Sequence, residues 1–199
     1  MTVFEFCKAL RRRIWSDSEI LLLVRPAGKP LDDTKRKPCP GEFRMVTEEN
    51  IQDCADFEDA VKYVPIYRGM LESGDYGQYG YLNGNCVYRE WLQRTGDLVF
   101  DGCKVRALRE NECISHYVFC APDARGKGFQ AASGARLISL FPEKVFYTMV
   151  LPEKPVSLKN YLRNGYEIRG LLTVKNRFFR RTLTEKPLSP EDVLTYLPE

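Results

Sequence analysis

The sequence has few residues that bind metals or form disulfides. It contains one histidine, His116, and seven cysteines that never form a Cys-x-x-Cys pair. The cysteines are odd in number and irregularly spaced, standing at positions 7, 39, 54, 86, 103, 113 and 120. Zinc sites and disulfide frameworks need closely spaced or evenly paired cysteines. We therefore expect reduced thiols and no metal site.

Long apolar runs and a strong charge of one sign are also absent. No stretch of about 18 apolar residues is present, so no membrane-spanning helix is expected. The N-terminus lacks the charged-then-apolar order of a signal peptide. The net charge is only +3, from 30 basic and 27 acidic residues, which is too small an excess to indicate a nucleic-acid surface. We expect a cytoplasmic protein that binds no nucleic acid.

The composition, with 44% hydrophobic residues among 199, suits one globular domain. Residues 3–16 have the pattern of an amphipathic helix that exposes Arg11–Arg13. This arginine triplet is either a solvated helix end or a contact for an acidic partner or membrane surface.

Alternating and periodic apolar residues predict the remaining elements. The Asn83-Gly84 pair predicts a hairpin turn between two strands. Thr47 is expected to begin a helix that Pro65 limits. The expected strands cover 19–25, 42–46, 76–82, 86–92, 114–120, 144–150, 166–172 and 177–183, with 98–108 extended and helices following residues 128, 156 and 188.

The segment from Tyr117 to Phe141 carries the most specific signal. An apolar strand stops at Pro122, and a helix rich in Ala, Leu and Ile follows Gly126 and Gly128. Glycines at a helix start let backbone N–H groups approach a bulky anion, which the helix dipole also favours. We interpret the turn as a pyrophosphate site. It is neither a P-loop, which needs Gly-x-x-x-x-Gly-Lys-Ser/Thr, nor a dinucleotide fingerprint, because its third position is Ala131.

Arg125-Gly-Lys-Gly-Phe-Gln130 resembles motif A of the GNAT superfamily of N-acetyltransferases, Arg/Gln-x-x-Gly-x-Gly/Ala. Gln130 departs from that motif and places a side chain toward the expected phosphates. Downstream, the segment from Ser157 through Tyr161 to Gly165 resembles the family's motif B, with Lys154 where the family often has Asn. The two motifs stand in the family's order, with a strand between them.

The resemblance implies an α/β protein with the GNAT (acyl-CoA N-acyltransferase) fold, a central mixed sheet of six to seven strands flanked by helices on both faces. The acetyltransferase domain is expected at residues 42–185. An N-terminal helix, strand and arm precede it at 1–41, and a C-terminal tail follows at 186–199.

The resemblance also implies acetyl-CoA as co-substrate. Strand residues Val118, Phe119 and Cys120 are expected to pair with the pantetheine arm, and backbone N–H groups from Gly126 to Ala131 to hold the pyrophosphate. The expected binding set is completed by side chains and turn residues from the two motifs: Arg125, Gly126, Lys127, Gly128, Phe129, Gln130, Ala131 and Ser157.

Direct transfer needs a base for the amine and an acid for the leaving thiolate. Tyr161 aligns with the family's tyrosine near the sulfur and is the expected acid, the alternative being packing beneath the cofactor. His116, on the strand before the pyrophosphate turn, is the candidate base because its ordinary pKa is about 6.5. A structural histidine is the equal alternative, and Glu90 and Glu112 are weaker base candidates.

The expected function is transfer of an acetyl group from acetyl-CoA to a primary amine of a small molecule, with an amino sugar as one acceptor. The alternatives are N-terminal or lysine acetylation of proteins, and a catalytically silent acyl-CoA-binding module. A homodimer is one option for the assembly.

Overall fold

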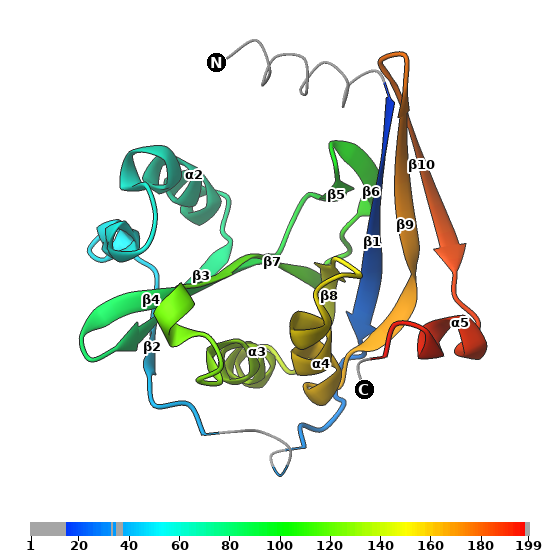
Figure 1. The fold of residues 1–199 in the computed structure, drawn as a ribbon. Helices are drawn as coiled ribbons and strands as arrows, with labels where there is room; N and C mark the ends of the chain where they lie inside the picture. The colour runs from blue at the N-terminus through cyan, green and yellow to red at the C-terminus, as the bar shows by residue number, and fades with distance from the viewer. Residues whose placement is uncertain (1–14, 33, 35–37, 198–199) are drawn as a thin grey trace.

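The computed structural model describes residues 15–32, 34 and 38–197. The helix expected at residues 3–16 and its arginine triplet therefore lie almost wholly outside the described residues. Eight strands form the main sheet (Figure 1), in the spatial order β10-β9-β1-β8-β7-β4-β3-β2. Their bounds are β1 Trp15–Arg25, β2 Glu42–Met45, β3 Tyr76–Leu82, β4 Asn85–Gln93, β7 Glu112–Cys120, β8 Val145–Val150, β9 Glu167–Arg177 and β10 Arg180–Pro187.

All neighbouring strands run antiparallel except β7 and β8, which are parallel. A separate hairpin, β5 (Asp97–Phe100) with β6 (Cys103–Ala107), occupies the segment expected to be extended. The Asn83-Gly84 turn is confirmed, and both of its residues have positive φ. The main sheet is thus mixed, with one more strand than the largest number expected.

Helices cover both faces of the sheet (Figure 1). Helix α2 (Ala60–Glu72) lies on one face, and α3 (Phe129–Leu140) and α4 (Pro155–Arg163) lie on the other. A 3-10 helix, Ile51–Asp56, accompanies α2, a second, Pro122–Ala124, precedes α3, and α5 (Pro190–Leu194) lies near the C-terminus. The expected fold class, a mixed α/β sheet between helices, is confirmed.

Alternation along the strands builds a core on each face. In β1, Leu21 and Leu23 belong to the cluster that includes α3 and α4, whereas Leu22 belongs to a different cluster. This is the period of two that an extended strand imposes. On the opposite face, Tyr67 of α2 stacks on Trp91 of β4 at 5.2 Å between ring centroids. Burial on both faces fixes the register of the central strands.

Strand β1 departs most from the expected organisation. Its residues were expected to precede the acetyltransferase-like domain, but β1 lies within the main sheet between β8 and β9. Its register places Trp15 opposite Arg177 and Arg25 opposite Phe146. Strand order arises from pairing between distant segments, which the apolar pattern of a single strand does not encode.

The helical region after Thr47 also differs from expectation. Helix α2 begins at Ala60, where the Asp59 side chain accepts a hydrogen bond from the N–H of Val61. Pro65 lies inside α2, so the expectation that it limits the helix was wrong. The hydrogen bond that proline removes is the one to the Val61 carbonyl. Val61 is 87% exposed, so water can satisfy that carbonyl.

Candidate functional site

The two parallel strands at the centre of the sheet separate partway along their length. Strands β7 and β8 pair from Glu112 opposite Val145 to Ser115 opposite Thr148. Strand β7 continues to Cys120 and pairs there only with β4. Beyond Ser115 the two strands are no longer paired with each other.

A β-bulge turns β7 at the point of separation. Arg89 pairs with Phe119 and Trp91 with His116, so two residues of β7, Tyr117 and Val118, stand opposite one residue of β4. Tyr117 has φ 48, a left-handed conformation that is unfavourable for an aromatic residue. The Arg89 guanidinium donates to the Tyr117 carbonyl and holds the bulge in place.

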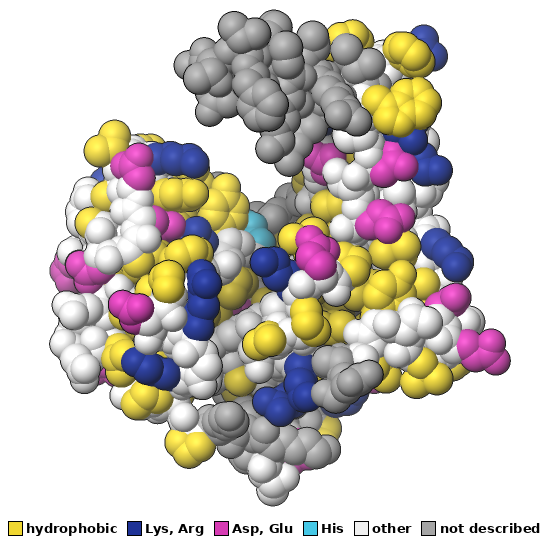
Figure 2. Space-filling view, in the orientation of Figure 1, with side chains coloured by type: hydrophobic (Ala, Val, Ile, Leu, Met, Phe, Trp, Pro, Cys, Tyr) yellow, Lys and Arg dark blue, Asp and Glu magenta, His cyan; other side chains and the backbone are white. Residues whose placement is uncertain are grey.

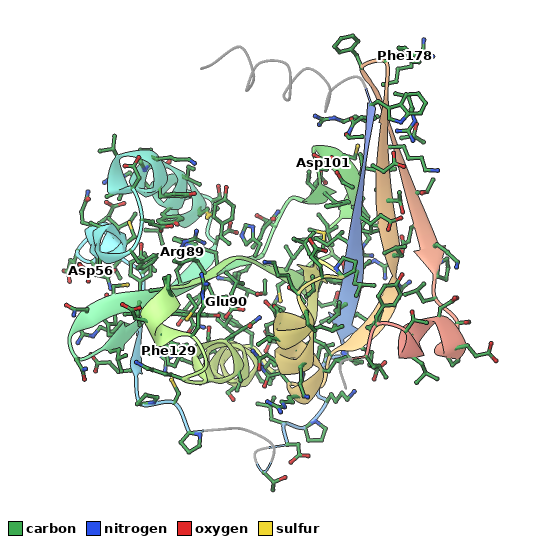
Figure 3. All side chains as sticks on the ribbon, viewed as in Figure 1. Asp56, Arg89, Glu90, Asp101, Phe129 and Phe178 are labelled. Carbon is green, nitrogen blue, oxygen red and sulfur yellow. The ribbon has the colours of Figure 1, made fainter. Side chains whose placement is uncertain are left out.

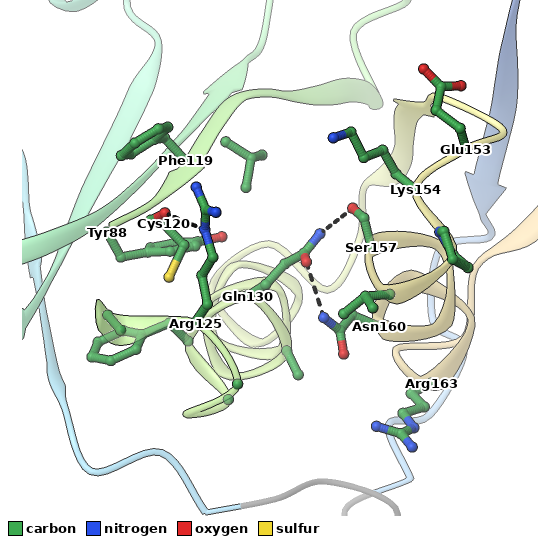
Figure 4. A pocket seen from close by; sticks show the side chains of 18 residues that line it. Tyr88, Phe119, Cys120, Arg125, Gln130, Glu153, Lys154, Ser157, Asn160 and Arg163 are labelled. Carbon is green, nitrogen blue, oxygen red and sulfur yellow. Dashed lines mark hydrogen bonds between the residues drawn. The ribbon is translucent and has the colours of Figure 1, made fainter. Parts of the chain in front are cut away.

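The larger cavity, of about 910 Å³, lies between the end of β7, the start of α3, and α4 (Figure 4). Its walls combine apolar strand residues with polar and basic residues of the two helices. They are Tyr88, Val118, Phe119, Cys120, Ala124, Arg125, Gly126, Gly128, Phe129, Gln130, Ala131, Glu153, Lys154, Pro155, Val156, Ser157, Asn160 and Arg163.

The turn before α3 directs backbone donors toward this cavity. Gly126 and Gly128 have φ 76 and 84, and Gly128 is the residue that immediately precedes the helix. No described side chain caps α3. The first N–H groups of a helix have no partner within it, so those of α3 are available to an anion. Arg125, Lys154 and Arg163 add three positive charges to the lining, against the one carboxylate of Glu153.

The motif comparison suggested that the Gln130 side chain points toward the phosphates. In the structure it instead contacts α4. Its Nε2 donates to Ser157 Oγ at 2.8 Å, and its Oε1 accepts from Asn160 Nδ2 at 3.0 Å. Figure 4 shows this side chain reaching across from α3 to α4. The departure from motif A is therefore a bridge between two helices, and it leaves the start of α3 open.

The smaller cavity, of about 310 Å³, lies at the separation of β7 and β8. Lys154, Ser157 and Val118 line both cavities, so the two adjoin. The other residues of its lining are Ile20, Ser115, His116, Tyr117, Thr148, Met149, Val150, Leu151 and Tyr161. Figure 2 shows the histidine deep in the hollow between the side that carries α2 and the side that carries β1.

His116 is half-buried and uncharged in this setting. Burial, together with the nearby charge of Arg89, lowers the pKa of His116 to about 4. Its Nε2 has no hydrogen-bond partner among the described residues. The imidazole is therefore uncharged near neutral pH, and its low pKa makes it a weak base.

Tyr161 is joined to a buried carboxylate through a serine. Its hydroxyl lies 3.4 Å from Ser115 Oγ, and Ser115 donates to Glu90. Glu90 also accepts from Ser133 and, at 2.9 Å, from Tyr88. Burial, together with Glu90, raises the pKa of Tyr161 to about 12. The phenol remains protonated at neutral pH and can act only as a proton donor there.

Most of the predicted site residues meet at these two cavities. Of the predicted binding residues, only Lys127 does not line the larger cavity, and it is exposed. His116 and Tyr161 line the smaller one. Glu112, a weaker base candidate, lies elsewhere and pairs with Arg106. The sequence analysis missed Asn160 and Arg163, whose positions three and six after Ser157 could have suggested the same helix face.

Comparison with known proteins identifies the architecture. No model of a known protein family matches the sequence, and no curated protein does. A functionally unknown conserved protein from Staphylococcus epidermidis is similar in structure, with a TM-score of 0.58 and 15% identity over 94% of this chain and 69% of that one. An acetyltransferase of the GNAT family from Colwellia psychrerythraea gives 0.53 at 9% identity, covering 92% of this chain and 62% of that one. The chain has the GNAT fold.

A third structure with the GNAT fold is a glucosamine N-acetyltransferase region of a fungal multi-domain β-N-acetylglucosaminidase. Its TM-score is 0.53 at 16% identity, over 83% of this chain and 22% of that one. The chain thus spans less than two thirds of the Colwellia protein and about a fifth of the fungal one. At these identities the likeness establishes the fold. The expectation of a GNAT fold is confirmed.

Clustered metal ligands and membrane-spanning helices are both absent from the described residues. They contain no group of three or more His, Cys, Asp or Glu arranged to hold a metal ion. No helix within the described ranges has the length and apolarity needed to cross a bilayer.

Proposed function

We propose that the chain is a cytoplasmic N-acetyltransferase that uses acetyl-CoA and acetylates a primary amine. One observation carries the proposal. A cavity with an uncapped helix N-terminus and basic residues in its lining adjoins, at the separation of β7 and β8, a second cavity lined by His116 and Tyr161.

The larger cavity fits CoA in charge and in polarity. The start of α3, with Arg125 beside it, suits the pyrophosphate. The polar side chains Gln130, Ser157 and Asn160 line the middle, where the amides of the pantetheine arm would pass. Apolar Val118 and Phe119 line the strand side. The thioester end would then lie near Ser157 and Lys154, which border both cavities.

The residues of the smaller cavity suit the transfer step. An amine must be uncharged to attack the thioester, and the departing thiolate needs a proton. His116, which lines this cavity, would take up the proton of the amine. Tyr161 holds its proton at neutral pH and would give it to the thiolate. Ser115 and Glu90 orient the Tyr161 hydroxyl from behind.

The charge of the smaller cavity bears on the class of the acceptor. The lining of the smaller cavity includes no Asp or Glu, so a strongly cationic acceptor would find no counter-charge there. We propose a small-molecule amine, and the fungal glucosamine N-acetyltransferase region with this fold supports an amino sugar as the first to test. Protein acetylation and a silent acyl-CoA-binding module are the alternatives.

Calorimetric titration with CoA and acetyl-CoA, followed by thiol-release assays over an amine panel, tests the proposal. We expect binding of both and turnover with at least one small amine. Binding without turnover on any amine or peptide would favour the silent module, and absence of binding would refute the CoA site.

The role of Tyr161 is tested with Tyr161→Phe, and Tyr76→Phe is the matched control outside both cavities. We expect Tyr161→Phe to keep the CoA affinity and to lower kcat by about 100-fold, the size of a lost general acid. Unchanged turnover would mean that another group protonates the thiolate.

A further inference from the structure

The hairpin tip between β9 and β10 exposes an unusual pair of aromatic residues. Phe178 and Phe179 form a two-residue turn in which both have positive φ, 48 and 67. Such turns favour Asn-Gly, because bulky side chains are unfavourable in this conformation. The two rings are 71% and 68% exposed, so burial within the chain does little to offset the strain.

A third aromatic residue extends this apolar tip. Trp15, at the start of β1, is 58% exposed, and its ring lies 6.2 Å from that of Phe178 in an edge-to-face arrangement. We call Trp15, Phe178 and Phe179 the aromatic tip. Figure 3 shows Phe178 at the far end of the hairpin, directed away from the body of the protein, and Figure 2 shows apolar and basic side chains together there.

Arginines flank the aromatic tip. Arg177 lies 4.1 Å over the Trp15 ring and pairs with Asp17 at 2.6 Å. Among the described residues, neither Arg180 nor Arg181 pairs with a carboxylate: Arg181 donates to the Asp101 carbonyl and to the Asn176 side chain. In the sequence, Arg11–Arg13 stand directly upstream of Trp15. The nearby acids, Asp17 and Asp101, are fewer than these cations.

We propose that the aromatic tip docks the protein on an anionic lipid bilayer. A projecting group of rings needs a soft apolar medium and no pre-shaped pocket, and aromatic residues favour the bilayer interface. Arginines beside the rings would contact anionic headgroups, as basic residues near a membrane do. This inference stands apart from the proposed transferase activity, since the tip contributes no residue to either cavity.

The protein contains its own probe for the test. It has two tryptophans, and the other, Trp91, is fully buried, so a change in emission on binding reports Trp15. Adding vesicles of phosphatidylcholine with phosphatidylglycerol should shift the emission to the blue and carry the protein into the vesicle pellet. Pure phosphatidylcholine vesicles should do so far less, and salt should weaken the binding.

Two double variants separate the apolar and charged parts. F178N/F179G removes both rings and installs the turn that this backbone prefers. Its affinity for anionic vesicles should fall about 10-fold or more, whereas relief of strain should raise its Tm by about 5 °C. R180Q/R181Q should lose about 5-fold in vesicle affinity per arginine and part of the salt dependence. Val61→Ser, which removes a remote exposed apolar side chain, is the control.

Failure of the natural protein to bind anionic vesicles, or unchanged binding of F178N/F179G, would overturn the proposal. Equal binding to neutral and anionic vesicles would refute the role of the arginines. Binding to nucleic acid through the tip, or self-association that F178N/F179G abolishes, would assign the surface to another partner.

Discussion

Replacing Arg89 by methionine leaves the carboxylate of Glu58 buried without its cation. The Arg89 guanidinium meets Glu58 at 3.0 Å, and the two side chains are only 8% and 7% exposed. Its central carbon also lies 5.4–5.6 Å from four aromatic ring centroids, those of Tyr63, Tyr67, Tyr117 and Phe119. After the substitution, Glu58 keeps only the hydrogen bond from the Tyr67 hydroxyl.

The expected loss of unfolding free energy is about 4 kcal/mol. Breaking a buried ion pair from one side costs about 3–5 kcal/mol, because one charge remains uncompensated in the interior. Arg89 also gives up its hydrogen bond to the Tyr117 carbonyl, which adds to the loss. Domains of this size are stable by about 5–15 kcal/mol, so the variant should fold but unfold at a clearly lower urea concentration.

Urea unfolding followed by circular dichroism measures the loss of unfolding free energy. The single variant Glu58→Gln and the double variant with Arg89→Met complete a double-mutant cycle for the pair. The double variant should cost about 2 kcal/mol less than the sum of the single ones, since neither charge is left alone. Arg68→Met is the matched control on α2. Its pair with Glu48 is 45% and 59% exposed, so its loss should stay below about 1 kcal/mol. If Arg89→Met cost no more than Arg68→Met, the reasoning about this buried pair would be refuted.

Two further predictions concern the candidate site. The pKa of His116 is about 4 in the folded protein and about 6.5 in the unfolded chain. As the pH is lowered, the unfolded chain therefore takes up a proton at this residue before the folded protein does. The unfolding free energy should therefore fall as the pH is lowered from about 6.5 to about 4, by up to about 3 kcal/mol. His116→Gln should lack this part of the fall in urea titrations at each pH, and an identical pH dependence in the variant would contradict the shift. Gly128→Ala should destabilise the fold by about 1–2 kcal/mol, because φ is 84 there. Gly69→Ala, in α2 with open space around it, should instead stabilise by about 0.5–1 kcal/mol, and equal effects of the two would refute the role of φ.

The sequence correctly predicted the features that depend on local backbone conformation. The chain takes positive φ at Asn83, Gly84, Gly126 and Gly128, and only a few residue types do so readily. Those positions placed a hairpin and the start of α3. The two motifs then supplied Arg125, Gly126, Gly128, Phe129, Gln130, Ala131 and Ser157 to the lining of the larger cavity. Residues on one turn or one helix remain neighbours in any fold that keeps those elements.

Features that depend on distant segments were not predictable in this way. The partner of Gln130 is set by the approach of α4 to α3, so its bridge to Ser157 and Asn160 could not be read from motif A. The lowered pKa of His116 depends on its burial in the fold and on the charge of Arg89, which lies on another strand. The Phe178-Phe179 turn contradicts the residue preferences of its own backbone, and so no turn rule could have found it.

The place of β1 in the sheet has a consequence for synthesis of the chain. Trp15–Arg25 is made before its partners, because it pairs with β8 and β9, whose residues lie more than a hundred positions later in the sequence. Until Glu167–Arg177 has left the ribosome, β1 carries unpaired backbone groups on at least one edge together with the apolar run Leu21–Leu23. Pairing at such separation is slow because a long loop must close first. The nascent chain therefore holds an aggregation-prone strand until β8 and β9 have been made, and chaperone dependence should fall on this strand more than on the local β3–β4 hairpin.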